Sequence, residues 1–165
     1  MKDISKLKTP RQKATLMFLV KEDSVLLAMK KRGFGVGRYN GVGGKPEGKE
    51  SVDATAVREA KEEVGVTARR FHLVAKLDFY FSKKREWDQQ VLVYVCDRWV
   101  GRPRETEEMK PAWFGKMDLP YKKMWSDDHL WLPHVLSGKY VRAKFVFNDS
   151  DGVENYKIII KDSKL

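Results

Sequence analysis

The chain has 165 residues, of which 42% are hydrophobic and 34% charged, a composition typical of one folded globular domain. No apolar run approaches the roughly 20 residues of a membrane span, and the basic N-terminal segment lacks the apolar stretch of a secretory signal. Cys96 is the only cysteine, so an internal disulfide is excluded and a reducing cytoplasm is the expected compartment. The net charge of +10, spread over short clusters, is compatible with phosphate ligands and with simple solubility.

The first predicted element is a β-hairpin. Residues 15–20 and 25–29 are apolar and β-prone, and Glu22-Asp23-Ser24 between them is a turn sequence. Residues 32–45 then contain six glycines and few apolar side chains. They predict a loop whose backbone turns tightly or approaches another group closely.

A helix is predicted over residues 51–64. Ser51 is a suitable N-cap and Gly65 a suitable C-cap, and Glu50 and Asp53 suit the positive end of the helix dipole. Small apolar residues recur at every fourth position and predict a narrow buried stripe: Val52, Ala56, Ala60 and Val64.

The remaining elements predict an α/β fold. Residues 71–81 and 90–95 are strand-like and flank a loop at 82–89. A short strand at 110–115, a helix at 127–136 and a hairpin formed by 144–147 and 156–160 follow. We find no repeat or linker, so we expect a single domain over residues 1–165, with helices packed on a mixed β-sheet.

Three acidic side chains carry the main chemical signal. Glu59, Glu62 and Glu63 are spaced i, i+3 and i+4, which places them on one face of the helix. Their mutual repulsion is relieved by a divalent cation, and Mg²⁺ prefers carboxylate oxygen. In isolation such a cluster is more often a solvated acidic face. The glycine loop directly before this helix favours an assembly of anion and metal instead.

The sequence from residue 44 to 66, GKPEGKESVDATAVREAKEEVGV, resembles the Nudix box. Ala60 stands where a bulkier aliphatic residue is usual, which concerns packing more than chemistry. Seven fixed positions of the motif are filled: Gly44, Glu50, Arg58, Glu59, Glu62, Glu63 and Gly65. Seven identities at fixed spacing make the motif specific.

The resemblance implies a Nudix-type α/β/α sandwich that hydrolyses a nucleoside diphosphate linked to another group. It implies that the three glutamates and the backbone carbonyl of Gly43 hold Mg²⁺, with Mn²⁺ as an alternative. Glu63 would accept or orient the proton of the attacking water. Arg58 and Glu50 would pair to orient the metal-binding turn, and Gly44 and Gly65 would be structural.

Three further segments, at residues 29–45, 108–114 and 124–128, resemble the animal MutT branch of this family. That resemblance implies cleavage of 8-oxo-dGTP and 2-hydroxy-dATP to the monophosphate and pyrophosphate. It also implies an additional metal carboxylate, Glu108, and a base pocket lined by Asn40, Trp125, Asp127 and Asp128, with apolar walls from Phe34, Phe79 and Met109 and with Thr15 and Lys30 at its rim.

The chemistry of these pocket residues agrees with the implied roles. Trp125 offers a stacking face, and Asn40 can donate and accept hydrogen bonds. Asp127 and Asp128 cannot both ionise cheaply in an apolar pocket, so a proton exchanged between them would let one site recognise both bases. The alternatives are an N-cap with a first-turn acid for the aspartates, a core position for Trp125, and a solvated position for Glu108.

Two other functions remain open at this level. The same chemistry could act on a dinucleoside polyphosphate or capped RNA, or the chain could be an inactive module that binds nucleotide or RNA. The three intact glutamates argue against inactivity. Two segments depart from the family pattern: the basic N-terminal extension and the loop at 82–89, which contains Trp87. We expect a monomer that acts on a small nucleotide, requires no nucleic acid and does not enter a membrane.

Overall fold

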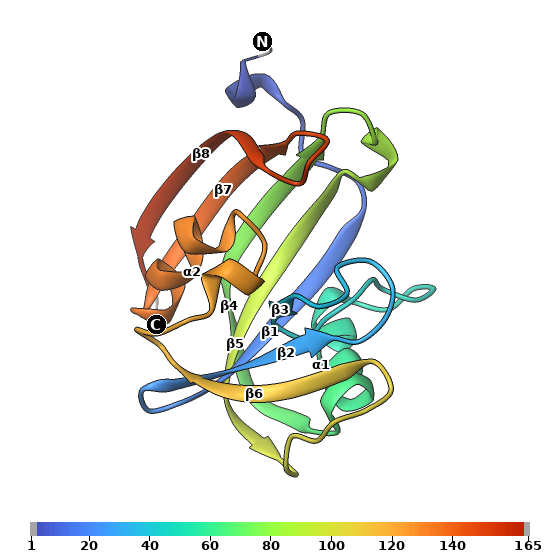
Figure 1. Cartoon of the computed structure of the whole chain (residues 1–165), viewed down its shortest axis with the longest axis vertical. Coiled ribbons are helices and arrows are strands. Elements are labelled where there is room, and N and C mark those ends of the chain that lie inside the picture. Colours follow the sequence, from blue (N-terminus) through green and yellow to red (C-terminus); the bar gives the residue numbers. More distant parts are fainter. Residues whose placement is uncertain (1–2, 164–165) are drawn as a thin grey trace.

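A computed structural model describes residues 3–163 as a mixed β-sheet with one helix on each face (Figure 1). The strand order is β3-β2-β1-β5-β4-β7-β8, and β6 pairs with β2 along the whole length of that strand. The strands are β1 (Lys13–Lys21), β2 (Ser24–Lys30), β3 (Tyr39–Asn40), β4 (Thr67–Phe81), β5 (Gln89–Val100), β6 (Met109–Gly115), β7 (Lys139–Phe147) and β8 (Val153–Asp162). The helices are α1 (Val52–Val64) and α2 (Asp128–Leu136), with short 3-10 turns η1 (Ile4–Lys6), η2 (Arg85–Trp87) and η3 (Tyr121–Lys123).

The pairing of the strands confirms the predicted mixed sheet. β1 and β2 form the expected antiparallel hairpin, with Val20 opposite Val25. β1 runs parallel to β5 and β4 parallel to β7, whereas β4 and β5 are antiparallel. β7 and β8 form the final hairpin, which is longer than the sequence indicated.

β4 and β5 also extend beyond their predicted ends. Four of the ten additional residues are charged, and an ion pair of 2.7 Å joins Arg70 Nε to Asp97 Oδ1 across the two strands. Both side chains face solvent, so this part of the sheet lacks the apolar pattern by which a strand is recognised from sequence.

Helix α1 forms as predicted. The Ser51 hydroxyl accepts a hydrogen bond from the Ala54 amide (3.1 Å), and Gly65 ends the helix with a φ of 78°. Ala56, Ala60 and Val64 are fully buried against the sheet, while Val52 is partly buried. Helix α2 packs on the opposite face around Trp131 and Leu132, so the sheet has an apolar core on each side.

The glycine loop approaches β1 closely, as its composition indicated. The Thr15 amide donates to the Gly44 carbonyl (2.8 Å), and Met17 pairs with Val42. A Cβ at residue 43 would lie 1.7 Å from the Thr15 carbonyl oxygen, so only glycine fits there. The loop also contains β3, which the sequence did not predict.

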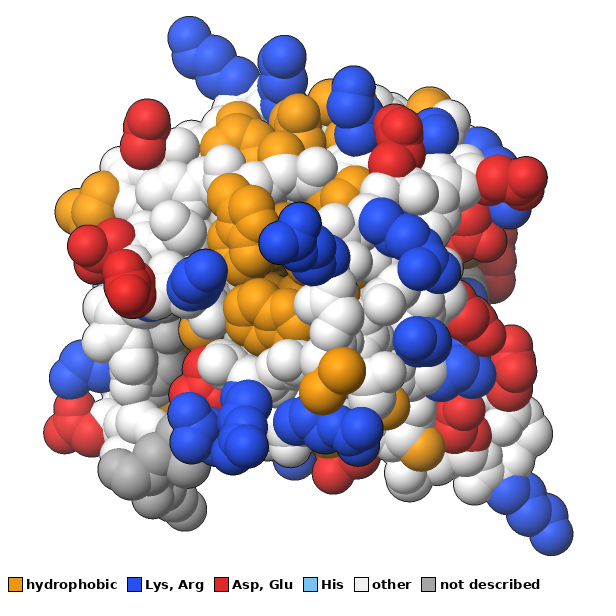
Figure 2. Space-filling model, turned by 90° about the horizontal axis from the view of Figure 1, so that it is seen from below, with side chains coloured by type: hydrophobic (Ala, Val, Ile, Leu, Met, Phe, Trp, Pro, Cys, Tyr) orange, Lys and Arg blue, Asp and Glu red, His pale blue; other side chains and the backbone are white. Residues whose placement is uncertain are grey.

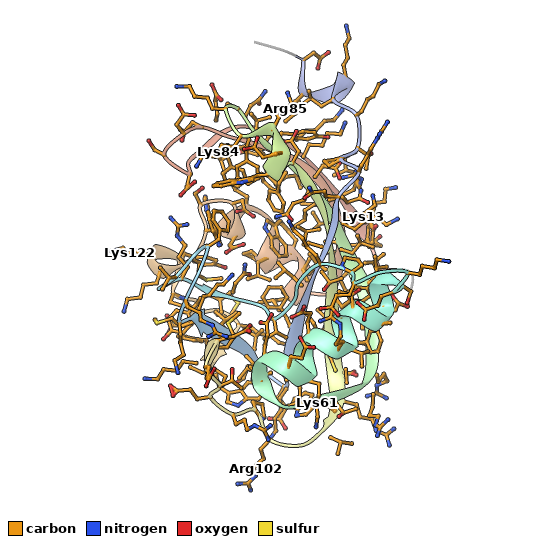
Figure 3. The ribbon with its side chains drawn as sticks, turned by 90° about the vertical axis from the view of Figure 1, so that its right-hand side faces the viewer. Lys13, Lys61, Lys84, Arg85, Arg102 and Lys122 are labelled. Carbon is orange, nitrogen blue, oxygen red and sulfur yellow. The ribbon has the colours of Figure 1, made fainter. Side chains whose placement is uncertain are left out.

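Basic side chains are dispersed over the surface. The face seen in Figure 2 carries an apolar strip with lysine and arginine side chains on several sides of it. In Figure 3, Lys84 and Arg85 lie at one end of the molecule, and Lys61 and Arg102 at the other. Across residues 3–163, no helix is both long enough and apolar enough to cross a membrane.

Candidate active site

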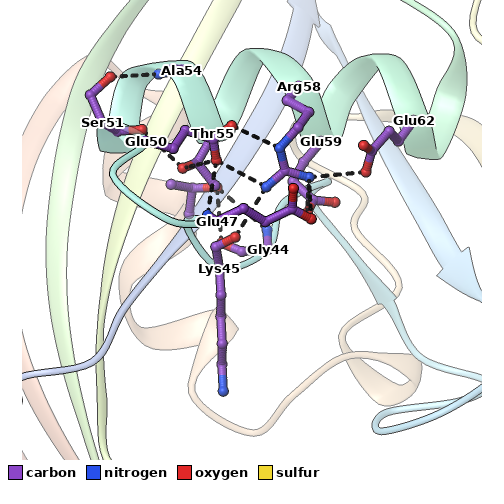
Figure 4. Close-up of polar contacts among 11 residues, drawn as sticks. Gly44, Lys45, Glu47, Glu50, Ser51, Ala54, Thr55, Arg58, Glu59 and Glu62 are labelled. Atoms are coloured by element: carbon purple, nitrogen blue, oxygen red, sulfur yellow. Dashed lines mark hydrogen bonds and ion pairs between the residues drawn. The ribbon is translucent and has the colours of Figure 1, made fainter.

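Arg58 organises the acidic face of α1 (Figure 4). Its Nε and Nη2 atoms donate to the two carboxylate oxygens of Glu50 at 2.8 and 3.0 Å, and Nη2 also donates to the Lys45 carbonyl. Its Nη1 atom donates to Glu59 (2.9 Å) and Glu62 (3.0 Å). These bonds tie the turn before α1 to the helix, the geometry expected for a structural Arg58–Glu50 pair.

Hydrogen bonds from Arg58, and then from Thr55, lower the pKa of Glu50 to about 2. Glu50 is therefore ionised at every pH at which the protein is expected to work. The pKa of Arg58 is raised, chiefly by the same pair, so the guanidinium carries a permanent charge.

Glu63 has a different environment from the other two helix glutamates. It is only 3% exposed, and its Oε2 atom has no hydrogen-bond partner among the described residues. Burial raises its pKa to about 9, with further contributions from a hydrogen bond with Glu59 and from the Glu59 charge, against the opposing effect of the Gly43 amide. A buried carboxyl oxygen without a partner is costly unless a ligand satisfies it.

The oxygen atoms of these carboxylates are of the kind that a hard divalent cation binds. Within residues 3–163, no three acidic, histidine or cysteine side chains converge in a metal-binding arrangement. Arg58 instead engages Glu59 and Glu62. The unpartnered oxygen of Glu63 and the close approach of Gly44 to Glu59, where a Cβ would lie 2.4 Å from Oε1, nevertheless place carboxylate oxygens on the side of α1 next to the glycine loop.

Glu108 does not join this group. Its side chain is about half exposed and pairs with Arg32 Nη2 at 3.3 Å, which is the solvated arrangement considered from the sequence. It lies near enough for its charge to contribute to the raised pKa of Glu63.

A cavity of about 480 Å³ adjoins the glycine loop. Gly43, Gly44 and Lys45 line one part of it and α2 lines another. All nine residues predicted to bind substrate line this cavity: Thr15, Lys30, Phe34, Asn40, Phe79, Met109, Trp125, Asp127 and Asp128. Its volume is within the usual range for a small-molecule site.

The two aspartates are buried in this cavity, at 3% and 2% exposure. Trp131 Nε1 donates to Asp127 Oδ2 (2.7 Å), and the Trp125 amide donates to Asp128 Oδ2 (3.2 Å). Asp127 occupies the N-cap position of α2 and Asp128 lies in its first turn, as the capping alternative had it, but the Asp127 side chain makes no capping bond.

Burial raises the pKa of both aspartates. The charge of Asp127 raises the pKa of Asp128 further, whereas the indole of Trp131 partly offsets the shift of Asp127. Burial and mutual repulsion thus both disfavour a doubly ionised pair, so the two carboxyls favour sharing one proton.

Aromatic rings form one wall of the cavity. Trp125 is partly exposed to it, and Phe34 lies at 5.1 Å between ring centroids with a tilt of 31°. The Arg38 guanidinium stacks on Trp125 at 3.9 Å. Trp87 meets Phe34 edge to face at 5.0 Å. Trp125 therefore lies in the cavity wall, in contact with Arg38 and Phe34, and not in the core.

Several cavity residues were missed from the sequence: Arg38, Phe81, Trp87, Gln89, Trp131 and Phe147. Phe81 could have been found, because alternate residues of a strand share a face and Phe79 was already assigned. Trp87 could not, since its position depends on the turn η2.

Asn40 and Thr15 are held by the loop itself. Asn40 Oδ1 accepts from the Gly41 amide (2.8 Å), which leaves the amide nitrogen of its side chain for a ligand. The Thr15 hydroxyl lies within hydrogen-bond distance of Gly44 N and O, at 3.4 and 3.3 Å. Thr15 thus supports the loop in addition to lining the cavity.

Comparison with known proteins gives consistent matches. The NUDIX domain profile matches residues 10–135. A Danio rerio protein described as an oxidized purine nucleoside triphosphate hydrolase is 38% identical over 87% of this chain and 92% of its own length. A Mus musculus protein of the same description is 38% identical over 90% of this chain and 95% of its own. The crystal structure of a MutT protein from Bacillus halodurans superposes with a TM-score of 0.79 at 25% identity, covering 89% of this chain and 97% of that one.

Proposed function

This chain belongs to the Nudix hydrolase family, and from that premise we propose that it hydrolyses oxidised purine nucleoside triphosphates, as its relatives' descriptions suggest. The substrates are of the type of 8-oxo-dGTP and 2-hydroxy-dATP. Water attacks one of the two phosphorus atoms that flank the oxygen bridging the α- and β-phosphates. A new P–O bond forms, the bond from that phosphorus to the bridging oxygen breaks, and the products are the nucleoside monophosphate and pyrophosphate. The reaction would remove damaged nucleotides before a polymerase can use them.

The phosphate end of the site lies at the glycine loop and α1. Glu59, Glu62, Glu63 and the Gly43 carbonyl would hold the cation, with Glu108 available as an outer carboxylate. Bound Mg²⁺, or Mn²⁺ in its place, would neutralise phosphate oxygens and lower the pKa of a water. Glu63, buried beside Gly43, would accept or orient the proton of the attacking water once a bound cation has lowered its raised pKa and ionised it.

Arg58 has a supporting role in this proposal. Two hydrogen bonds to Glu50 anchor the guanidinium independently of Glu59 and Glu62. Glu59 and Glu62 can therefore turn to a cation while Arg58 keeps the turn before α1 in place.

The base end of the site lies at α2. Trp125 would stack on the purine, and the side-chain amide of Asn40 would donate to its edge. Protonated Asp128 would donate and ionised Asp127 would accept, and reversal of that arrangement would suit the second base. Different pH profiles of kcat/KM for the two substrates are expected, and indistinguishable profiles would remove proton exchange from the proposal.

The observation that carries the proposal is the single cavity, which reaches from Gly43 and Gly44 to the buried aspartate pair. A phosphate chain and an oxidised base can thus be bound at once, one beside α1 and the other beside α2. The free Oε2 of Glu63 at the phosphate end indicates that this site is built for a charged ligand.

A substrate panel tests the proposal. Pyrophosphate release would be measured with Mg²⁺ on 8-oxo-dGTP, 2-hydroxy-dATP, dGTP, a dinucleoside polyphosphate and capped RNA. We expect preference for the two oxidised nucleotides, loss with a chelator, and recovery with Mg²⁺ or Mn²⁺. Preference for the dinucleotide or capped RNA would replace the proposed substrate, and no turnover of any compound would indicate a binding module.

The setting of the reaction is part of the same proposal. We place it in the cytoplasm, because the single Cys96 is buried and unpaired and suits a reducing compartment. We expect a monomer, because one chain supplies both ends of the cavity. A molar mass near 19.2 kDa by light scattering would support this, and a dimer mass would contradict it.

A further inference from the structure

A second hollow lies outside the nucleotide cavity and shares no lining residue with it. This groove, of about 740 Å³, lies between residues 3–12 and the η2 turn, with Tyr80 in its wall. Tyr80 and Arg85 face the groove, whereas Phe81 and Trp87 of the same segment face the nucleotide cavity. The groove is therefore built by the two segments that depart from the family pattern.

The chain holds this groove open in a defined shape. The Tyr80 hydroxyl donates to the Lys8 carbonyl (2.8 Å), and Lys144 Nζ donates to the Leu7 carbonyl (2.6 Å). The Gln90 amide donates to the Gln12 carbonyl (2.9 Å), so residues 7–12 are anchored along the sheet. Ile4 and Pro10 are buried beneath them.

Four basic and three acidic side chains line the groove, so its net charge is +1. Lys6, Lys8 and Arg11 are exposed, and within residues 3–163 none of the three forms an ion pair. Of the three acidic residues in the lining, only Asp88 forms an ion pair within the part of the chain that the structure describes. Asp88 binds Arg85 Nε and the Phe81 amide, and Asp3 accepts from Ser5.

Three unpaired cations around a preformed groove match the chemistry of a phosphate-bearing ligand. We propose that the groove between residues 3–12 and η2 is a second anion site, which binds consecutive phosphates of a polyphosphate or of a single-stranded nucleic acid. The two sources share one chemistry and differ in whether bases are attached. The nucleotide substrate itself binds at the other site in our proposal, so either site can be absent without the other.

NMR signals of individual backbone amides can distinguish ligand binding at the groove from binding at the nucleotide cavity. The full chain, without divalent metal, would be titrated with inorganic triphosphate and followed by ¹⁵N–¹H NMR. We expect saturable shifts for the amides of residues 6–9, 11–12 and 85–88, distinct from any shifts at residues 43–45. Shifts confined to residues 43–45 would overturn the proposal and leave the proposed activity untouched.

Matched variants test whether the groove cations are responsible. The triple variant Lys6→Ala, Lys8→Ala, Arg11→Ala should weaken triphosphate binding at the groove by about tenfold or more. The control variant Lys122→Ala, Lys123→Ala, Arg102→Ala removes the same charge far from the groove, as Figure 3 shows for Lys122 and Arg102. Equal weakening by both variants would mean non-specific attraction by net charge and would overturn the site.

The source of the phosphates is resolved with a dye-labelled oligonucleotide of ten thymidines. If it binds more tightly than triphosphate and loses affinity in the groove variant, the ligand is a nucleic-acid strand. In the groove variant, the plot of log K against log[salt] should then be less steep than in the wild type by about 2. The reason is that each of the three lost contacts to a single strand contributes about 0.7 to the slope. If triphosphate binds and the oligonucleotide does not, the ligand is a free polyphosphate.

Discussion

Replacing Asp127 tests the base-recognition half of the proposal. Asp127→Asn is the better substitution, because Asp127→Ala would leave the buried Trp131 indole N–H without a partner, at a cost of about 1–3 kcal/mol in folding stability. The amide oxygen of the substituted side chain can still accept from that indole. Its other arm then presents an NH₂ donor where the carboxylate presented an acceptor, so the oxidised base loses a charge-assisted hydrogen bond.

A hydrogen bond to a charged group contributes about 1.5–3 kcal/mol, which corresponds to a loss of roughly 10- to 150-fold in kcat/KM. We expect that loss on 8-oxo-dGTP and a much smaller one on dGTP, measured as pyrophosphate release at several substrate concentrations. Asp118→Asn, which alters an exposed acid outside the cavity, is the control. An equal loss on both nucleotides would show that Asp127 does not discriminate between the bases.

Three further changes test the phosphate end and the fold. Glu63→Gln should lower kcat by at least about 10²-fold, the usual contribution of a general base, because an amide cannot accept the proton that a cation-ionised carboxylate would accept. Its melting temperature without metal should change little, because the burial that raises the pKa of Glu63 to about 9 favours the neutral form there. A simultaneous loss of folding would assign Glu63 a structural role instead. Arg58→Ala should lower the melting temperature near neutral pH. The pKa of Glu50 is depressed in the folded state, so its stabilising contribution is present above the unfolded value of about 4.3 and is lost as pH falls toward 2. The difference in melting temperature between wild type and Arg58→Ala should therefore shrink over that range, and a constant difference would refute the pairing argument. Gly43→Ala should disrupt the loop and abolish activity, because its Cβ would lie 1.7 Å from a β1 carbonyl, whereas Gly115→Ala has 3.8 Å of clearance. Both variants would be compared by circular dichroism and turnover, and an active Gly43→Ala would contradict the close approach.

Local spacing explains why α1 was predictable from the sequence. Residues three and four apart share a helix face because of the helical repeat. The capping residues are recognised because they directly precede and follow the helix in the sequence. The acidic face, the stripe of small residues and both helix ends therefore follow from one short run of consecutive residues. The β1–β2 hairpin is predictable for the same reason, because its strands meet across a short turn.

Burial and long-range pairing had to come from the tertiary structure. The spacing of Glu59, Glu62 and Glu63 makes them equivalent in the sequence, but only Glu63 is buried in the structure, where the Gly43 amide, distant in the chain, contacts it. Likewise, the sequence leaves Asp127 compatible with a helix cap. Only the structure shows that its carboxylate accepts a hydrogen bond from the Trp131 indole.

The chain's own residues thus determine the reaction class locally, through glycines and carboxylates at fixed separations along α1 and the loop before it. The shape of the base pocket and the second groove depend on segments that are far apart in the chain, such as Lys8 with Tyr80 and Leu7 with Lys144. Such contacts form only when the whole sheet is assembled, because no covalent spacing relates their partners. Only the tertiary structure therefore decides which side chains are buried, which are paired, and which remain free to meet a ligand.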